Sequence, residues 1–232
     1  MVAELVVVSE VGAEVACAKA VTALRNGEVI VLPTDTVYGV SADAFNPAAT
    51  AQVFVAKQRK PDLALPVLVH SPKQLPGIVL TISDAAERVM AAFWPGPLTI
   101  VFDTQPALRW DLGVPTGTVA VRMPLDDVML RVIRETGPLA VTSANRSGQA
   151  AATTAREAFD ALSEAVTLVI DDGPRRDLAP STIVDLSAHS PRILREGAIG
   201  SDLVMAVCRA QIEPLEAAAQ FAQMQHDRER GV

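Results

Sequence analysis

The sequence predicts one α/β domain built around a largely buried sheet of mixed strand direction. Short apolar runs of strand length alternate with helical stretches along almost the whole chain, which is the pattern of an α/β fold. Half of the 232 residues are apolar, which is ample for a buried core. Two long connections, 98–119 and 166–194, lack a helical segment, so some neighbouring strands should run antiparallel.

Eight runs rich in Val, Leu and Ile are the predicted strands. They cover residues 29–32, 67–70, 98–102, 119–122, 139–142, 166–170, 182–186 and 192–194. The alternation with helices and the helix-free connections together exclude a purely parallel Rossmann topology.

Capping residues mark where the helices begin and end. The stretch 13–26 stops at Gly27, a usual left-handed cap, and Asn46-Pro47 opens a helix that runs to about Lys57. Thr154 and Glu157 form a capping box for another helix. The remaining helix starts are Ser83-Asp84, Asp126-Asp127 and Ser201, and a stop near Glu213-Pro214 precedes a last helix. We therefore expect one main domain over 1–205 and a helical tail over 206–232.

Charge and composition exclude several classes of protein. The chain has 20 basic and 27 acidic residues, a net charge of −7, so it is neither disordered nor a polycation that tracks nucleic acid along an extended basic face. Every apolar run is interrupted before the roughly 20 residues that a membrane-spanning helix needs. Only Cys17 and Cys208 are present, and neither belongs to a CxxC pair or a zinc-ligand cluster. Acidic residues from Glu4 onward leave no room for a secretory signal, so we expect a cytoplasmic protein.

The familiar phosphate-binding and catalytic motifs are absent, but polar clusters follow several strands. The sequence contains no P-loop, GxGxxG, HExxH or GxSxG motif. The clusters are 33–39, 122–124, 142–145, 181–182 and 195–197. Because ligands bind beyond strand ends in open α/β sheets, these clusters predict a shared site.

Each cluster also has a purely structural interpretation. Residues 33–36 form an ordinary turn if their hydroxyls bind their own backbone, and 143–148 can be a plain loop. Arg122 and Arg195 follow apolar strands, where a guanidinium needs an anion, and an internal carboxylate would serve as well as a substrate. Lys57 and Arg59 lie near a helix C-terminus, which favours cations, and His70 can be a satisfied buried histidine.

Taken together, the clusters and their neighbouring residues occur in an order that resembles one protein family. The carrying segments are Pro33-Thr34-Asp35-Thr36-Val37-Tyr38-Gly39, Ala56-Lys57-Gln58-Arg59, Phe93-Trp94-Pro95-Gly96-Pro97-Leu98-Thr99, Val119-Ala120-Val121-Arg122-Met123-Pro124, Thr142-Ser143-Ala144-Asn145-Arg146-Ser147-Gly148, Ser181-Thr182-Ile183-Val184-Asp185 and Leu194-Arg195-Glu196-Gly197. In this order and spacing the sequence resembles the YrdC-like threonylcarbamoyl-AMP synthases, over about residues 13–201. The resemblance is to the short form of the family, which lacks the extra C-terminal domain.

The resemblance implies a twisted mixed sheet around a central, positively lined cavity, and a reaction of L-threonine, bicarbonate and ATP that gives threonylcarbamoyl-AMP and pyrophosphate. It assigns catalysis to Lys57 and Arg59, and ATP binding to Lys57, Arg59, Thr118, Ser143, Asn145 and Arg195. It assigns threonine binding to Thr36, His70, Arg122, Thr142 and Ser181, with no metal ligand supplied by the protein. Mg²⁺ would enter with ATP, and separate proteins would transfer the threonylcarbamoyl group to tRNA.

The sequence departs from the family pattern at three places. Gln58 replaces a common Gly, Asp35 stands where Glu is frequent, and the stretch 60–65 is longer than in many relatives. Two other functions stay open: an RNA- or nucleotide-binding module without catalysis, which would contact RNA weakly given the net charge of −7, and a different carbamoyl or adenylyl transfer.

Overall fold

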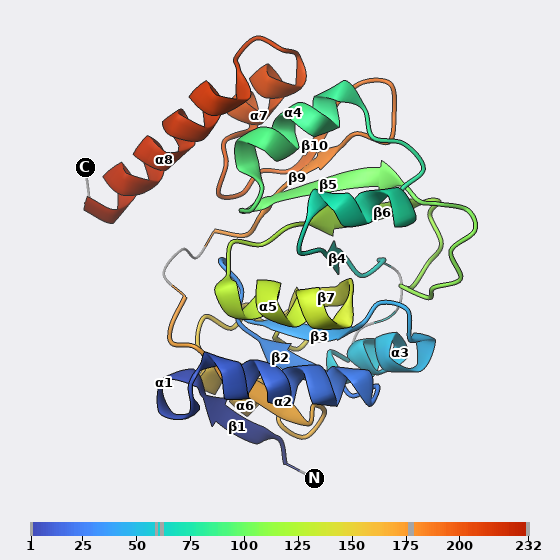
Figure 1. Cartoon of the computed structure of the whole chain (residues 1–232), viewed down its shortest axis with the longest axis vertical. Helices are drawn as coiled ribbons and strands as arrows, with labels where there is room; N and C mark the ends of the chain where they lie inside the picture. The colour runs from blue at the N-terminus through green and yellow to red at the C-terminus, as the bar shows by residue number, and fades with distance from the viewer. Residues whose placement is uncertain (1, 59, 61–62, 176–178, 231–232) are drawn as a thin grey trace.

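The computed structural model describes residues 2–58, 60, 63–175 and 179–230, and Figure 1 shows the whole chain. Its strands are β1 (Glu4–Val7), β2 (Ile30–Leu32), β3 (Gly39–Asp43), β4 (Val67–Leu68), β5 (Leu98–Asp103), β6 (Thr118–Arg122), β7 (Leu139–Ser143), β8 (Leu168–Asp171), β9 (Thr182–Asp185) and β10 (Arg192–Arg195). Its helices are α1 (Val8–Val11), α2 (Ala13–Arg25), α3 (Pro47–Ala56), α4 (Asp84–Phe93), α5 (Asp127–Thr136), α6 (Ala155–Leu162), α7 (Ser201–Cys208) and α8 (Pro214–Arg230), with a short 3₁₀ helix at Pro72–Gly77.

The described strands form one mixed sheet, as the sequence predicts. Their order is β1-β8-β2-β3-β7-β4-β6-β5-β9-β10. The pairs β1–β8, β2–β8, β4–β6 and β5–β9 are parallel. The pairs β2–β3, β3–β7, β4–β7, β5–β6 and β9–β10 are antiparallel. Both helix-free connections therefore lead into an antiparallel pair, β5–β6 and β9–β10.

Two strands were not predicted, β1 and β3. The residues of β3 are Gly-Val-Ser-Ala-Asp, most of which have low strand propensity. The strand forms because β2 and β7 pair with its two edges, so tertiary pairing outweighs local preference. Gly39 is required there, since a Cβ at this position would lie 2.5 Å from Cγ1 of Val141. The predicted strand 67–70 is shorter in the structure, because His70 turns toward the 3₁₀ helix and its N–H donates to Oε1 of Gln74 (2.8 Å).

The predicted helix ends are confirmed. The Asn46 side chain accepts hydrogen bonds from the N–H groups of Ala48 and Ala49 at the start of α3, and Thr154 with Glu157 forms the capping box of α6. Gly27, just past α2, has the left-handed φ of 79° that this cap requires.

Helices cover the two faces of the sheet unequally. One core contains the buried residues of α2 and α5 packed on β1, β2, β7 and β8. The other core contains buried residues of α3, α4, α6, α7 and α8. In Figure 1 the elements separate into a half with β1, β2, β3 and β7 and a half with β5, β6, β9 and β10, and the two-residue β4 lies between them.

The C-terminal helices pack on α4. Phe221 of α8 meets Phe93 of α4 edge to face, with ring centroids 6.1 Å apart, and α8 projects beyond the sheet in Figure 1. The predicted boundary at residues 205 and 206 falls within α7, and the division into domain and tail stays a prediction. None of the helices among the described residues combines the length and the hydrophobicity needed to cross a membrane.

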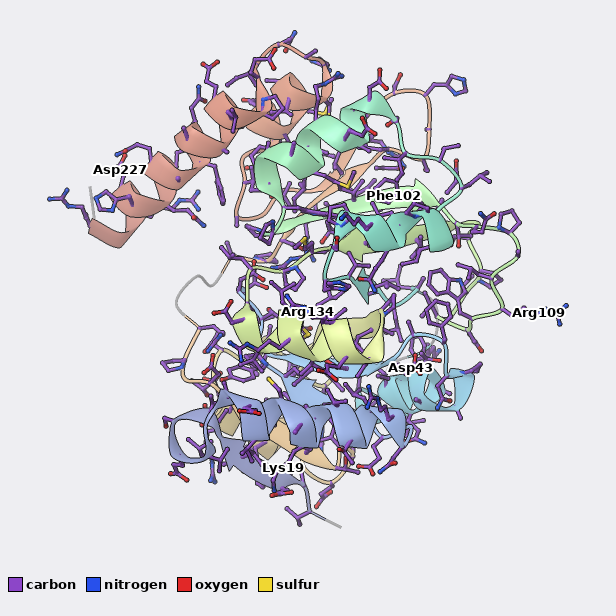
Figure 2. All side chains as sticks on the ribbon, in the orientation of Figure 1. Lys19, Asp43, Phe102, Arg109, Arg134 and Asp227 are labelled. Atoms are coloured by element: carbon purple, nitrogen blue, oxygen red, sulfur yellow. The ribbon has the colours of Figure 1, made fainter. Side chains whose placement is uncertain are left out.

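Figure 2 shows how the side chains are distributed. The label on Phe102 marks a side chain of β5 that is only 2% exposed, whereas Arg109 and Asp227 lie at the periphery.

Candidate active site

The register of the strands places Arg122, a predicted site residue, on the same face of the sheet as Thr99, which was not predicted. Arg122 pairs with Leu68 across β6 and β4. Thr99 occupies the position opposite Arg122 when the register of β5 and β6 is continued past Ile100 and Val121. Directly paired residues point to the same face, and Leu68 belongs to the core under α2 and α5. Arg122 and Thr99 therefore lie on the face of the sheet that α2 and α5 cover, at a place farther along the sheet.

A cavity of about 360 Å³ opens on this face. We call it the arginine cavity, and its lining includes Thr36, Thr99, Arg122, Thr142, Ser143, Ser181 and Arg195. A second hollow of about 500 Å³, the lysine cavity, is lined by Lys57, Gln58, Lys60, Leu63, Thr142, Ser143, Asn145, Ser147 and Gly148. Both cavities share Thr142 and Ser143, at the end of β7, so they adjoin one another.

The turn after β2 is held together by its own hydroxyls. Oγ1 of Thr34 accepts hydrogen bonds from the N–H groups of Thr36 (3.2 Å) and Val37 (3.3 Å), and it lies 2.6 Å from the Val37 carbonyl oxygen. The structural interpretation of this turn is therefore correct for Thr34. Thr36, in contrast, also contacts a predicted site residue, because its Oγ1 accepts a hydrogen bond from Nη1 of Arg122 (3.2 Å).

Arg122 is buried and paired with a carboxylate. Its Nε donates to the carbonyl oxygen of Gly96 (3.0 Å), and its Nη2 forms an ion pair with Oδ1 of Asp35. The side chains are 8% and 11% exposed, respectively. The carboxylate of Asp35 thus supplies the anion that a buried guanidinium requires. This confirms the interpretation of Arg122 in which the anion is an internal carboxylate. Since a guanidinium carries five N–H groups, Arg122 still has donors for a ligand.

Arg195 rests on the start of β9. Its Nε and Nη2 donate to the carbonyl oxygen of Ser181 (3.0 and 2.8 Å), and Nη2 also donates to Oγ of Ser181 (3.0 Å). Oγ of Ser181 is in turn 2.8 Å from Oγ1 of Thr99. Partial burial, and then the charge of Arg122, lower the pKa of Arg195.

Gly197 explains why Arg195 can reach this position. A Cβ on Gly197 would lie 2.1 Å from the carbonyl oxygen of Pro180 and 2.6 Å from the carbonyl carbon of Ser181. The chain after β10 can therefore approach β9 only with Gly at this place. Thr182 fixes the approach, since its Oγ1 accepts hydrogen bonds from the N–H groups of Gly197 and Ile199, both at 3.0 Å.

Lys57 ties the end of α3 to the loop after β7. Its ammonium group donates to the carbonyl oxygens of Ser143 and Asn145, the latter at 2.8 Å, and to Oδ1 of Asn145 at 3.2 Å. The side-chain amide of Asn145 donates to the carbonyl oxygen of Gln149 (2.8 Å). Lys57 is only 3% exposed. Its hydrogen bonds to the carbonyl oxygens of Ser143 and Asn145 hold the loop after β7 at the wall of the lysine cavity.

Two predicted residues of the described part of the chain line neither cavity, and a third predicted residue lies outside the described part. Thr118 lies at the opposite end of β6 from Arg122, where its Oγ1 is 2.9 Å from that of Thr116. His70 lines neither cavity, and its Nδ1 is buried without a hydrogen-bond partner among the described residues. Arg59 lies outside the described residues. The roles that the resemblance implies for these three stay predictions.

Arg175 was not predicted as a site residue, but it contacts the turn after β2 and the start of α5. Its Nη1 donates to Oδ2 of Asp126 (3.0 Å) and to the carbonyl oxygen of Thr34 (3.4 Å), and the guanidinium lies over the ring of Tyr38. Burial raises the pKa of Asp126, and burial raises the pKa of Tyr38 to about 12. A signal was present in the sequence, because Arg175 closely follows the buried strand β8, much as Arg122 ends the largely buried strand β6.

The linings of the two cavities contain no carboxylate among the described residues, and the described part of the chain has no group of three or more His, Cys, Asp or Glu residues that could hold a metal ion. A larger hollow of about 690 Å³ lies between α2 and α5, but it contains none of the predicted site residues and its rim mixes both signs of charge. The chemistry of the site therefore rests on cations, hydroxyls and amides.

Comparison with known proteins identifies the family. A sequence model of the Sua5/YciO/YrdC family, described as telomere recombination, matches residues 22–197. The chain belongs to this family. The match spans Thr36 to Arg195 and thus every predicted site residue.

Relatives within the family are similar over most of the chain. A putative threonylcarbamoyl-AMP synthase of Mycobacterium leprae is 48% identical over 182 residues, which are 78% of this chain and 83% of the relative. A protein of the same description from Mycobacterium tuberculosis is 42% identical over 202 residues, 87% of this chain and 91% of the relative.

Solved structures of family members have the same fold. The structure of Pyrococcus abyssi Sua5 complexed with L-threonine superimposes with a TM-score of 0.81 at 31% identity, and the match covers 89% of this chain and 61% of that one. Escherichia coli YciO superimposes with a TM-score of 0.76 at 21% identity, covering 88% and 99%, which shows the shared fold.

Proposed function

We propose that this protein is a threonylcarbamoyl-AMP synthase. It joins L-threonine, bicarbonate and ATP to give L-threonylcarbamoyl-AMP and pyrophosphate, the first step in forming threonylcarbamoyladenosine in tRNA. The mycobacterial relatives carry the name of this activity, and the Pyrococcus relative binds L-threonine. The observation that carries the proposal is the pair of adjoining cavities, one with two arginines among hydroxyls and one with Lys57 and Asn145.

Threonine occupies the arginine cavity in this proposal. The guanidinium of Arg122 binds the carboxylate, for which its planar fork of donors is suited. The hydroxyls of Thr36, Thr142 and Ser181 line the same cavity and bind the remaining polar atoms of the amino acid. His70 is the further threonine contact that the resemblance assigns.

ATP binds on the side of the lysine cavity. Lys57 and Arg59 act at its phosphates, Ser143 and Asn145 bind beside them, and the resemblance adds Thr118 and Arg195. Ser143 belongs to both cavities, so the α-phosphate can come next to the amino acid there. Mg²⁺ enters as the complex with ATP, held mainly by the phosphates and water, since no carboxylate of the described residues lines either cavity.

The reaction requires two anions to meet. The amine of threonine and bicarbonate form a carbamate, whose oxygen attacks the α-phosphorus while pyrophosphate leaves in line. Fixed cations offset the repulsion between carbamate and phosphate and stabilise the charge that grows on the leaving group, and hydroxyls and amides orient the attack. No nucleophilic side chain is needed for this chemistry.

The product leaves for other proteins. Separate transferases that act on tRNA receive threonylcarbamoyl-AMP, in the cytoplasm, and direct binding of RNA by this acidic protein is weak. The family resemblance and the net charge of −7 support this part of the proposal.

The test is pyrophosphate release from purified protein. ATP, L-threonine and bicarbonate together should release pyrophosphate, and omission of any one should abolish the release. Lys57→Ala and Arg59→Ala should each lower turnover at least about tenfold, because each removes a charge-assisted contact worth about 1.5 to 3 kcal/mol. Lys73→Ala, which alters an exposed lysine outside both cavities, should leave the rate unchanged.

Equal pyrophosphate release without threonine would refute the proposal. Release with carbamoyl phosphate in place of bicarbonate, or with serine as efficiently as with threonine, would instead favour a different carbamoyl transfer. Retention of double-stranded RNA on a filter, with a steep dependence on salt, would favour the binding module over the enzyme.

A further inference from the structure

Arg175 contacts the turn after β2 but lines neither the arginine cavity nor the lysine cavity. Its guanidinium lies 5.4 Å from the ring centroid of Tyr38, and its Nη1 makes a long hydrogen bond of 3.4 Å to the carbonyl oxygen of Thr34. Nε and Nη2 donate to the carbonyl oxygen of Gly173 (3.2 and 3.0 Å), which also accepts from the Tyr38 hydroxyl (2.6 Å). Arg175 therefore contacts both ends of the segment 34–38 from the loop after β8.

The segment 34–38 carries the groups that hold Arg122. Asp35 forms the ion pair with Arg122, and Oγ1 of Thr36 accepts from its Nη1 (3.2 Å). The hydrogen bonds within the turn join Thr34 to its neighbours in sequence, so they fix the shape of the turn. The contacts with Arg175 add a support from outside the turn.

Neutralising a buried carboxylate does not account for the whole environment of Arg175. Arg175 forms an ion pair with Asp126 (3.0 Å), and the two side chains are 12% and 5% exposed. A single ammonium group would neutralise Asp126 as well. The planar fork of a guanidinium, however, reaches Asp126 and the carbonyl oxygen of Gly173 at the same time.

Charge also couples Asp126 to the turn. Burial raises the pKa of Asp126, Arg175 opposes the rise, and the charges of Asp172 and Asp35 add to it. Asp35 and Asp126 therefore repel one another, and Arg175 offsets the repulsion. Loss of Arg175 would remove both the contacts with the turn and this compensation.

We propose, on the basis of the proposed function, that Arg175 is a positioning residue for threonine binding, which holds the turn where Asp35 and Thr36 orient Arg122 toward the threonine carboxylate. Arg175 acts through the turn and does not touch the substrate. A displacement of about 1 Å in a site can cost about 100-fold in rate, so a loosened turn should weaken threonine binding. The segment 34–38 does not line the lysine cavity, so ATP binding should change little.

Isothermal titration calorimetry with L-threonine tests this role. Arg175→Lys keeps a positive charge beside Asp126 but loses the fork, so it should fold and should raise the Kd for L-threonine at least about fivefold. Arg175→Gln also loses the charge and should raise the Kd at least about tenfold. In pyrophosphate release the KM for threonine should rise by the same factors, while kcat and the KM for ATP change less than about twofold.

Asp126→Asn is the matched control, because it removes the ion pair and leaves the other contacts of Arg175 in place. It should lower the urea midpoint, since the Arg175 guanidinium loses its closest carboxylate, and should change the Kd for L-threonine less than about twofold. An equal rise in Kd for Asp126→Asn and Arg175→Lys would overturn the assignment, because stability alone would then explain the effect. A wild-type Kd in both Arg175 variants would overturn it as well.

Amide hydrogen exchange makes the test independent of the ligand. The N–H groups of Thr36 and Val37 are hydrogen-bonded within the turn, so their exchange rates, measured by NMR, report how often the turn opens. Relative to amides of β5, both should exchange at least about tenfold faster in Arg175→Lys and at the wild-type rate in Asp126→Asn. Unchanged rates in Arg175→Lys would overturn the positioning role. If the wild type binds no L-threonine, the proposed function fails, and the exchange rates still decide whether Arg175 holds the turn.

Discussion

The ion pair between Asp35 and Arg122 is the clearest case in which one residue determines the chemistry of another. Both side chains are nearly buried, and Arg122 also donates to Thr36 and to the Gly96 carbonyl oxygen. Asp35 therefore holds the guanidinium in place through charge, while Thr36 and Gly96 set its orientation. The Asp that stands where the family often has Glu still reaches Arg122 directly.

Asp35→Ala should lower the free energy of unfolding by about 3 kcal/mol, because it leaves Arg122 nearly buried without its counter-charge. Asp35→Glu keeps the charge and should lose less than half of that amount. Urea unfolding monitored by circular dichroism measures both.

Asp160→Ala is the control for this pair. Asp160 pairs with Arg156 on α6, where the side chains are 56% and 75% exposed, so its loss should cost no more than about 0.5 kcal/mol. Equal midpoints for Asp35→Ala and Asp160→Ala would show that burial of the Asp35 pair has no energetic consequence.

Among the elements, β9 and β10 position two of the site residues, Ser181 and Arg195. Gly197→Ala should move the backbone at 180–182, because the new Cβ would lie within 2.7 Å of Thr182 N and closer still to Ser181. We expect a loss of about 1–3 kcal/mol of stability and a higher KM for threonine, read from thermal melts and pyrophosphate release.

Gly200→Ala is the matched control for Gly197→Ala. A Cβ on Gly200 meets nothing within 4 Å, and its φ of −61° suits alanine. This variant should match the wild type in the KM for threonine. Similar KM values for the two alanine variants would show that the close approach at Gly197 does not position Ser181.

The capping box of α6 gives a prediction with a pH dependence. Hydrogen bonds from Thr153 and Thr154 lower the pKa of Glu157. The stabilisation from Glu157 is therefore complete above about pH 4.3, the pKa of an unfolded Glu, and is lost as the pH falls through the lower folded value. Thr154→Ala should cost about 1 kcal/mol at pH 7, and Thr154→Ser should cost little.

Urea midpoints of Glu157→Gln and of the wild type, measured from pH 7 to pH 3, test this prediction, because the Glu157 carboxylate accepts from the N–H groups of Thr153 and Thr154. The difference between them should shrink in acid as Glu157 takes up a proton. A difference that stays constant down to pH 3 would exclude a contribution from the Glu157 carboxylate.

Sequence patterns predicted those elements whose signals are local. Asn46, Gly27 and the pair Thr154 and Glu157 mark helix ends through their own side chains or backbone, and the structure confirms all of them. β3 escaped prediction because its formation depends on β2 and β7, which lie far from one another in the sequence.

The features of the candidate site divide in the same way, into those with a local signal in the sequence and those that depend on tertiary contacts. Arg122, Ser181 and Thr142 could be grouped from strand ends, because register carries them to one face. The partner of Arg122 and the role of Arg175 depend on which loops meet in space, and a single sequence does not contain that information.

At the scale of the whole molecule, the arginine cavity joins the two halves of the sheet. Thr36 and Thr142 come from the half with β2, β3 and β7, whereas Thr99, Ser181 and Arg195 come from the half with β5, β9 and β10. Among the described strands, β4, a strand of two residues, is the only one that connects these halves within the sheet. A ligand in the cavity therefore adds contacts across the weakest part of the sheet.

L-Threonine at about 100 times its Kd should stabilise the protein by about 2.7 kcal/mol, because it binds the folded state alone. For a chain of this size that corresponds to a rise in Tm of about 5–10 °C, measurable by differential scanning fluorimetry. Arg122→Gln should abolish the rise, since the carboxylate loses its partner, and Arg134→Gln, on the exposed side of α5, should retain it. A rise of the same size with D-threonine, or in Arg122→Gln, would show that the amino acid binds elsewhere.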